Sequence, residues 1–277
     1  MKTKPLYQTY LINLDRATDR LELMQKEFEK CEITYERISA VDAKTLDSST
    51  YKVKNKYDRD LVPGEIGCYL SHVKTLETFL ASENDFALII EDDAILVNDF
   101  KSAVEKAMIQ YDDLERKDHW DVLKLFNGKR KHIKIADVDQ KYIIAACGTS
   151  IPITTIAAIW TRKAAEKFLN KIKTPLPTIQ RPIDCDLQHA WEFDLRIYNL
   201  LPSLVKPAPV ETQIQINRSL RKSKFPKQIQ YELNRLFPKY FYLINHHGFK
   251  KFYDSFIVKK NERISLSTII TLIKLLN

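Results

Sequence analysis

The sequence predicts an α/β fold built on a mainly parallel sheet, followed by a basic and mainly helical C-terminal segment. Three observations support this prediction. Short apolar runs typical of strands alternate with segments of helical periodicity along the first 205 residues. The hydrophobic content is 44% of 277 residues, which is sufficient for a sizeable core. Lys and Arg outnumber Asp and Glu by 44 to 36, and the excess lies towards the C-terminus.

The uneven charge predicts a division of the chain into two parts. From residue 206 onward there are 14 Lys and Arg against 4 Asp and Glu, a net charge of +10. Residues 1–205 carry 30 basic and 32 acidic residues, a net charge of −2. We therefore expect a nearly neutral main domain over 1–205 and a basic appendage over 206–277.

Strands are expected where aromatic and β-branched residues gather. The run 86–90 is continuously apolar, as in a strand that is buried on both faces. The other expected strands cover residues 7–13, 33–38, 120–126, 142–147 and 156–160, the last of these as the final central strand.

Helices are expected between these strands, because apolar residues recur there every three or four positions. They begin at Asp15, Pro63, Phe100 and Thr161, and Thr161 is the expected N-cap of the last one. The polar segment 51–61 is expected to be an exposed or mobile loop.

Three carboxylates, Glu91, Asp92 and Asp93, directly follow the apolar run 86–90. They therefore lie at the carboxyl end of a core strand, which is where open α/β sheets bind ligands. Alternate residues of an extended segment point the same way, so Glu91 and Asp93 are expected to converge on one cation. Oxygen ligands favour Mg²⁺ or Mn²⁺, which also bind substrate phosphates. The alternative is a solvated acidic turn or a helix N-cap.

A second acidic pair, Asp184 and Asp186, lies in the segment 182–187. One of the two is a candidate general base, and the alternative is that one of them caps the following helix. The nearby His189 is as well explained by a packed or surface histidine as by a ligand.

Three further polar residues are candidates for a site. His72 lies beside the apolar stripe of the second helix, where a half-buried structural histidine is the simpler interpretation. Arg16 and Arg20 are spaced to face one anion, or else pair with acidic side chains on the surface.

Several classes of protein are excluded or disfavoured. The sequence has no Walker loop, no G-x-G-x-x-G and no G-x-S-x-G motif. Its four Cys are widely spaced, which predicts reduced and partly buried thiols. There is no signal-peptide pattern and no apolar stretch of about 18 residues, so a soluble, cytoplasmic protein is expected.

Four blocks, in order, resemble glycosyltransferase family 25, which contains bacterial lipooligosaccharide galactosyltransferases and collagen galactosyltransferases. The second block, G-E-x-G-C-x-x-S-H, is the most specific, and the resemblance covers roughly residues 6–205. The blocks are Ile12-Asn13-Leu14-Asp15-Arg16 with Arg20, Gly64-Glu65-Ile66-Gly67-Cys68-Tyr69-Leu70-Ser71-His72, Ile90-Glu91-Asp92-Asp93-Ala94, and Pro182-Ile183-Asp184-Cys185-Asp186-Leu187.

This resemblance implies a GT-A-like, Rossmann-like nucleotide-sugar-binding domain that transfers a sugar, often from UDP-galactose, with inversion. It implies Glu91 and Asp93 as ligands of Mn²⁺ or Mg²⁺, and Asp184 or Asp186 as the general base. The implied donor-binding residues are Asn13, Arg16, Arg20, His72 and Asp92. One region departs from the family, since residues 156–161 read Ile-Ala-Ala-Ile-Trp-Thr where a Gly-Ala-Tyr-like stretch often stands, and this changes the pocket wall.

The basic appendage allows three interpretations. Its Lys and Arg residues between 218 and 227, with aromatic residues around 237–242, are typical of docking on an anionic membrane surface at the inner face of the cytoplasmic membrane. A helical appendage packed on the main domain is the second interpretation. Nucleic-acid binding is the least favoured, because no recognised motif is present.

The sequence therefore predicts a metal-assisted galactosyltransferase that acts on a lipooligosaccharide or lipopolysaccharide acceptor. Two other functions remain open. One is a non-catalytic protein that binds a nucleotide-sugar or a glycan, and the other is a metal-dependent phosphoesterase built on Glu91-Asp92-Asp93.

Overall fold

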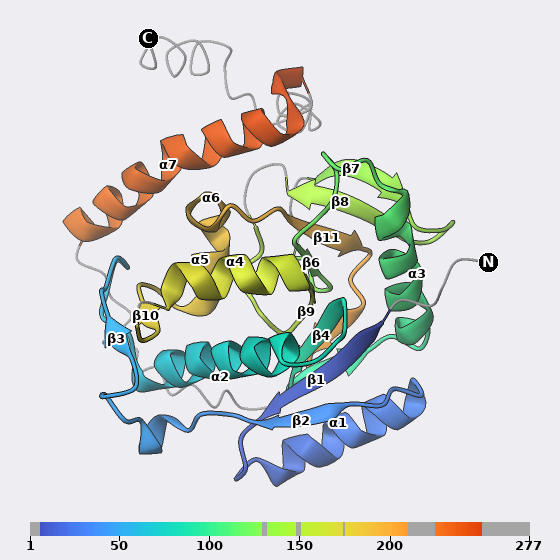
Figure 1. Ribbon diagram of the computed structural model, residues 1–277, viewed down its shortest axis with the longest axis horizontal. Helices are drawn as coiled ribbons and strands as arrows, with labels where there is room; N and C mark the ends of the chain where they lie inside the picture. Colours follow the sequence, from blue (N-terminus) through green and yellow to red (C-terminus); the bar gives the residue numbers. More distant parts are fainter. Residues whose placement is uncertain (1–5, 129–131, 148–150, 174, 210–224, 251–277) are drawn as a thin grey trace.

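The computed structural model describes residues 6–128, 132–147, 151–173, 175–209 and 225–250, and its centre is an eight-stranded sheet (Figure 1). The strand order is β2-β1-β4-β9-β6-β11-β8-β7. The strands are β1 (Tyr7–Asn13), β2 (Glu36–Ser39), β4 (Phe86–Glu91), β6 (Val122–Lys124), β7 (His132–Asp137), β8 (Ile143–Cys147), β9 (Ala157–Thr161) and β11 (Ile197–Leu201). Two short pairs complete the described strands: β3 (Lys52–Val53) with β10 (Thr178–Ile179), and β5 (Ala94–Leu96) with β12 (Val205–Pro207).

The direction of the strands confirms the expected α/β fold with a mainly parallel sheet. Six of the eight strands run the same way, and only β8 and β9 are reversed. One prediction was wrong, because β9 is not the final central strand. The later strand β11 inserts between β6 and β8. The sequence did not reveal this strand, because it is only five residues long and its neighbours in the sheet are far away in the sequence.

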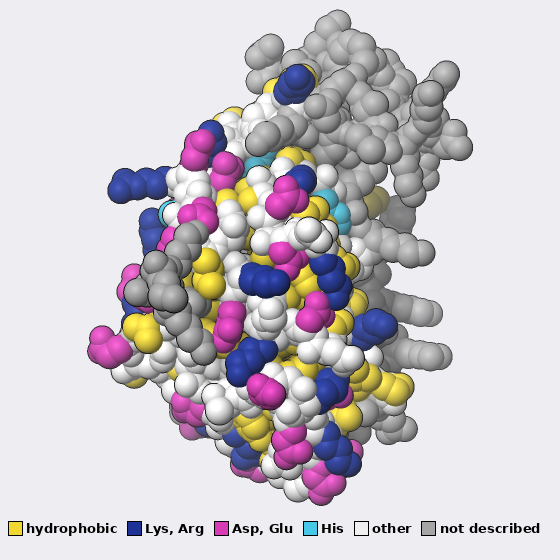
Figure 2. Space-filling model, turned by 90° about the vertical axis from the view of Figure 1, so that its right-hand side faces the viewer, with side chains coloured by type: hydrophobic (Ala, Val, Ile, Leu, Met, Phe, Trp, Pro, Cys, Tyr) yellow, Lys and Arg dark blue, Asp and Glu magenta, His cyan; other side chains and the backbone are white. Residues whose placement is uncertain are grey.

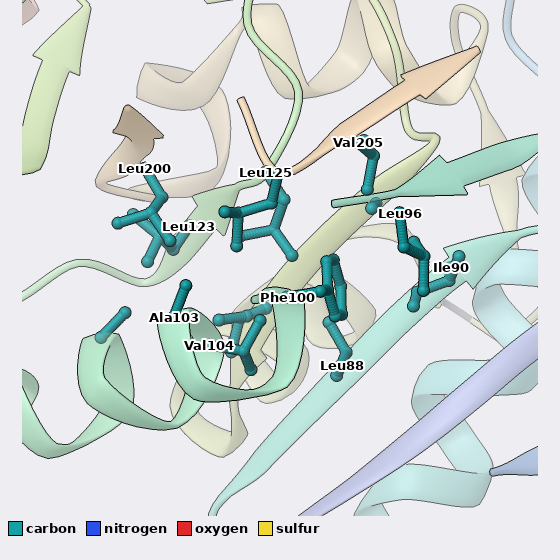
Figure 3. Close-up of a cluster of buried hydrophobic side chains, with 14 of the residues drawn as sticks. Leu88, Ile90, Leu96, Phe100, Ala103, Val104, Leu123, Leu125, Leu200 and Val205 are labelled. Carbon is teal, nitrogen blue, oxygen red and sulfur yellow. The ribbon is translucent and has the colours of Figure 1, made fainter. Parts of the chain in front are cut away.

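Helices cover both faces of the sheet and bury two apolar clusters. α1 (Thr18–Lys30) and α3 (Phe100–Asp113) pack on one face, whereas α2 (Pro63–Leu80) and α4 (Arg162–Ile172) pack on the other. Strand β4 contributes to both clusters, since Leu88 and Ile90 face one and Ala87 and Ile89 the other. Figure 3 shows Phe100 of α3 close to Leu88. This two-sided burial explains the continuous apolar run before the carboxylates.

Local interactions fix where the helices begin. Thr161 accepts a hydrogen bond from the Ala164 amide at 3.1 Å, which confirms the predicted N-cap of α4. Helix α1 begins at Thr18 and not at Asp15. The Asp15 carboxylate is instead bound by Arg37 and Ser39, which holds this residue outside the helix. The expected loop 51–61 is exposed for the most part but contributes the short strand β3.

The described part of the C-terminal appendage packs on the main domain. Besides residues 206–209, it contains the helix α7 (Phe225–His247), which follows two short helices, α5 (Ile183–Gln188) and α6 (Ala190–Phe193), in the chain. The Tyr242 hydroxyl donates a hydrogen bond to the Leu195 carbonyl, and Leu243 is buried. The described part therefore matches the packed-appendage interpretation. The basic residues 218 to 224 and the end of the chain from 251 lie outside the described residues.

The surface of the described residues agrees with the nearly neutral charge of residues 1–205. On the face shown in Figure 2, Lys and Arg side chains are interspersed with Asp and Glu side chains. Within the described ranges, none of the helices is both long and apolar enough to cross a membrane.

Candidate functional site

The sequence-predicted residues gather at the carboxyl ends of β1 and β4, beside the first half of α2. Asn13 ends β1, and Glu91 ends β4. A pocket at this edge is lined by Arg16, Arg20, Cys68 and the carboxylates 91–93. This is the position at which an open α/β sheet binds its ligands.

Asp92 belongs to a buried polar network that joins β1, β4 and α1. Its Oδ1 accepts a hydrogen bond from Arg20 Nη1 at 2.8 Å, and its Oδ2 accepts one from Asn13 Nδ2 at 2.8 Å. Arg37 Nε in turn donates to Asn13 Oδ1 at 2.9 Å. Arg20 is buried, so of the two interpretations offered for it, pairing on the surface was wrong. Arg16 lies at the rim of the pocket and forms an ion pair with Asp42 at 3.3 Å.

Glu91 is held by side chains from α2 and from the segment before β9. Its Oε1 lies 2.9 Å from His72 Nε2 and 2.5 Å from Thr155 Oγ1, and both groups donate to it. Burial opposes ionisation of Glu91, but the hydrogen bonds and charge of its partners outweigh burial and lower its pKa. His72 is fully buried, whereas a half-buried histidine beside the apolar stripe was expected.

Of the three carboxylates, that of Asp93 has the fewest hydrogen-bond partners among the described residues. Its Oδ1 is buried and has no hydrogen-bond partner among the described residues. Burial, and after it the charge of Glu91, raises the pKa of Asp93 to about 6. Glu91 and Asp93 would hold a divalent cation, which would give this oxygen the partner it lacks, so the residues present fit the predicted metal.

A second donor group surrounds Glu91. Ligand atoms of Cys68, His72 and Glu91 all lie within 4.8 Å of one another, which is close enough to hold a metal ion. Burial, followed by the charges of Glu91 and Asp184, raises the pKa of the Cys68 thiol well above its ordinary value. The thiol is thus protonated in the free protein, and the hard oxygens of Glu91 and Asp93 remain the better match to Mg²⁺ or Mn²⁺.

The signature block on α2 brings this helix close to the loop at Val41. The Cα of Gly67 leaves no space for a side chain, because a Cβ there would lie 2.6 Å from the Val41 carbonyl oxygen. Ser71 Oγ accepts a hydrogen bond from the Val41 amide at 2.8 Å. Glu65 caps the helix by accepting from the Val62 amide at 3.0 Å. The block therefore positions His72 beside Glu91.

The second acidic pair lies on α5, and its two members differ in environment. Asp186 is fully buried and accepts hydrogen bonds from the Tyr69 hydroxyl and Arg181, both at 2.9 Å. Asp184 is half-buried, and its Oδ1 accepts a hydrogen bond from the amide of Cys185 at 2.7 Å. Burial raises the pKa of both carboxyls, that of Asp186 to about 6. Neither side chain caps the helix, so the N-cap alternative was wrong.

Lys124 is a buried cation at the end of β6 that the sequence reasoning missed. Its ammonium donates to the Pro152 carbonyl at 2.5 Å, and burial lowers its pKa to about 8. Its charge acts on Asp184 and is itself affected by Asp184 and Glu91, so Lys124 is coupled electrostatically to both acidic groups. The signal in the sequence is a single Lys inside the apolar strand segment Val122-Leu123-Lys124-Leu125-Phe126.

The remaining candidates are structural. His189 is buried and donates from Nδ1 to the Cys185 carbonyl at 2.7 Å, which agrees with a packed histidine. Cys31, Cys68, Cys147 and Cys185 are all free thiols, as predicted.

The fold and this edge of the sheet define an α/β protein with a carboxylate-lined ligand site. The model of glycosyltransferase family 25, described as an LPS biosynthesis protein family, matches residues 7–186. The chain therefore belongs to glycosyltransferase family 25, and the predicted family is confirmed. This membership supports glycosyl transfer in general.

The relatives include proteins named as galactosyltransferases and proteins named as inactive. Procollagen galactosyltransferase 2 of Homo sapiens is 31% identical over 220 residues, which are 72% of this chain and 35% of that protein. Procollagen galactosyltransferase 1 of Danio rerio is 26% identical over 72% of this chain and 36% of that protein. Inactive glycosyltransferase 25 family member 3 of Homo sapiens is 27% identical over 72% of this chain and 36% of that protein. The chain thus matches about a third of the length of these relatives.

Among solved structures, A197 from STIV gives a TM-score of 0.35 at 15% identity, covering 73% of this chain and 83% of that one.

Proposed function

We propose that this protein is an inverting glycosyltransferase that transfers galactose from UDP-galactose to a lipooligosaccharide or lipopolysaccharide acceptor. The observation that carries the proposal is the buried and unpartnered Asp93 Oδ1 beside Glu91, with Lys124 linking this pair electrostatically to Asp184. In such an arrangement Glu91 and Asp93 would bind a cation that holds the diphosphate, and Asp184 would act as the carboxylate base. Relatives named galactosyltransferases support the choice of sugar.

Glu91 and Asp93 are the residues that would hold a divalent cation, Mn²⁺ or Mg²⁺. When bound, such a cation supplies Lewis-acid stabilisation of the diphosphate leaving group. The chain itself prepares the site: His72 and Thr155 fix the orientation of Glu91, and the lowered pKa keeps Glu91 ionised.

The donor is held at the ends of β1 and β4. We assign Arg16, at the rim of the pocket, to contact with the nucleotide or its phosphates. Asn13, Arg20 and Asp92 bond to one another, so their role is to fix the shape of the donor site. His72 supports the site through Glu91.

Asp184 is the proposed general base, because it is half-buried and its Oδ1 accepts a hydrogen bond from a neighbouring backbone amide, that of Cys185. A base must reach the acceptor hydroxyl, and Asp186 is already occupied by Tyr69 and Arg181. We therefore assign Asp186 to holding α5 in place. The charge of Lys124 opposes the rise in the pKa of Asp184 and so favours its basic, ionised form.

The basic appendage is proposed to bring the enzyme to an anionic membrane surface, where a lipid-linked acceptor is presented. Replacing Arg218, Arg221, Lys222 and Lys224 with Gln tests this role without removing α7. We expect weaker sedimentation with phosphatidylglycerol vesicles at low salt. Unchanged binding would show that these residues do not direct docking.

The relatives named inactive favour one alternative, a protein that binds a nucleotide-sugar without transferring it. A thermal-shift screen of UDP-sugars with and without Mn²⁺ identifies the donor, because the best ligand raises the melting temperature most. Release of UDP that requires an acceptor then supports the transferase. Stabilisation by UDP-galactose without acceptor-dependent release would support the binding protein, and phosphate release from simple esters would support a phosphoesterase.

A further inference from the structure

A second cavity, of about 410 Å³, lies between α7 and the segment that carries α5 and α6. Its charged lining consists of four cations and one carboxylate. The cations are Lys56, Arg181, Lys227 and Arg235, and the carboxylate is Glu192. The volume is in the range of small-molecule sites, and the excess of cations suits an anion.

Three potential donors that line the cavity have no partner among the described residues. By geometry, Arg181 Nε, Arg235 Nε and the Tyr231 hydroxyl are each buried without a hydrogen bond, although the Arg235 guanidinium lies close enough to the Tyr231 hydroxyl to oppose the rise in its pKa. A buried unpaired donor is costly, and three of them around one cavity indicate that acceptor atoms belong there.

The remaining bonds of the two guanidinium groups fix their orientation. Arg181 donates to Asp186 at 2.9 Å and to Glu192 at 2.7 Å, whereas Arg235 donates to Gln188 at 3.0 Å. Glu232 also pairs with Arg235, at 3.3 Å. The groups are thus held in place before a ligand arrives, which lowers the entropy lost on binding.

One wall of the cavity is aromatic. The rings of Tyr57 and Tyr231 meet edge to face, with centroids 5.5 Å apart, and His189 lies 5.6 Å from Tyr231. Burial, followed by the charge of Arg181, lowers the pKa of His189 to about 4, so the imidazole adds no positive charge near neutral pH. A site with an aromatic wall and a few fixed polar groups suits a small organic molecule better than a free ion.

We propose that this cavity binds a phosphate group carried by a sugar. A phosphate monoester offers only acceptor oxygens, which are the groups that the unpaired nitrogens and the Tyr231 hydroxyl lack. The cavity borders α5, the helix that carries Asp184, because Arg181 pairs with Asp186 on that helix and His189 bonds to its Cys185 carbonyl. That the phosphorylated sugar is part of the acceptor rests on the proposed function.

Calorimetric titration of the full chain with glucose 6-phosphate tests the site without any transferase assay. The informative variant is Tyr231→Phe, which keeps the ring and removes a hydroxyl that forms no hydrogen bond of good geometry with the described residues, so the melting temperature should change little. We expect binding to weaken at least tenfold, as for the loss of a hydrogen bond to a charged group. Arg235→Gln should weaken binding further.

The matched control is Tyr242→Phe, the same change on the same helix outside the cavity. The Tyr242 hydroxyl bonds to the Leu195 carbonyl, so this variant should melt at a lower temperature and bind glucose 6-phosphate like the wild type. Equal affinity in the wild type and Tyr231→Phe, or equal affinity for glucose and glucose 6-phosphate, would overturn the proposal.

A phosphate can also come from a lipid headgroup, and a vesicle arm separates the two sources. We expect sedimentation with phosphatidylglycerol vesicles to be the same for the wild type and Tyr231→Phe. If this variant lost vesicle binding and the wild type did not bind glucose 6-phosphate, the phosphate would come from a lipid headgroup. That result would overturn the proposal of a sugar phosphate. Glucose 6-phosphate binding in a protein without UDP-galactose transfer would reject the proposed function and leave the phosphate site standing.

Discussion

Arg20 in α1 and Asp92 after β4 form a buried ion pair, with 2.8 Å between Nη1 and Oδ1 and side chains that are 5% and 11% exposed. The pair joins segments that are 72 residues apart and holds the turn that carries Glu91 and Asp93. Because each charge has left water, the pair is expected to matter most when one partner is removed.

Arg20→Gln should therefore destabilise the protein by about 3 kcal/mol, since it leaves the Asp92 carboxylate buried without its cation. Urea unfolding followed by circular dichroism measures this loss. The matched control is Lys134→Gln, whose ion pair with Asp137 is exposed and should leave the midpoint nearly unchanged. Similar midpoints for the two variants would contradict a structural role of the Arg20–Asp92 pair.

The close approach of α2 to Val41 predicts a specific effect at Gly67. A Cβ at this position meets a backbone oxygen at 2.6 Å, so Gly67→Ala must displace the helix or the loop and should cost about 1–3 kcal/mol. Gly128→Ala is the control, because nothing lies within 4 Å of its added Cβ. Thermal unfolding compares the two, and a melting temperature that falls equally in both would show that the contact at Val41 is not responsible.

The different environments of Asp184 and Asp186 predict different defects. Asp184→Asn should lower kcat by roughly 10²–10⁴-fold, as for the loss of a general base, with little change in melting temperature. Asp186→Asn should lower the melting temperature, because it removes a charge that Arg181 contacts in a fully buried position. Kinetics and thermal unfolding of both variants test the assignment of Asp184 as the base. A large loss of kcat in Asp186→Asn alone would assign Asp186 as the base instead.

The pH dependence of kcat/KM should report the proposed base. The active form of Asp184 is ionised, and burial raises its pKa, so activity should rise with pH through a value above that of an ordinary Asp. Lys124→Met removes the cation that opposes this rise and should move the profile to higher pH. Lys106→Met, at a surface ion pair, is the control and should leave the profile in place. A profile that moves to lower pH in Lys124→Met would reject this coupling.

Metal dependence provides a separate test of Glu91 and Asp93. Asp93→Asn should abolish stimulation by Mn²⁺ and lower activity, because the second oxygen ligand loses its charge. In the metal-free protein the same change removes a buried carboxyl group, whose pKa is raised to about 6. Full activity with unchanged metal dependence in Asp93→Asn would show that the cation binds elsewhere, for which the group of Cys68, His72 and Glu91 is the next candidate.

The amino-acid sequence determined the class of fold, most of the helices and the edge at which the site lies. Periodicity located α2 and α3, and the apolar run before Glu91 located the central strand β4, because local pattern and burial agree in these segments. The order of the strands did not follow from local pattern. Strand β11 is short, and its place between β6 and β8 depends on contacts with distant segments.

The contacts of the polar residues could be read only from the tertiary structure. The spacing of Arg16 and Arg20 suggested one shared anion, but packing places Arg20 on Asp92 and Arg16 on Asp42. The sequence could not separate Asp184 from Asp186, since both lie on one short helix and differ only in what surrounds them. Lys124 stood in an apolar strand without an evident role. Its significance arises because the fold brings its charge near carboxylates from two distant parts of the chain, Glu91 and Asp184.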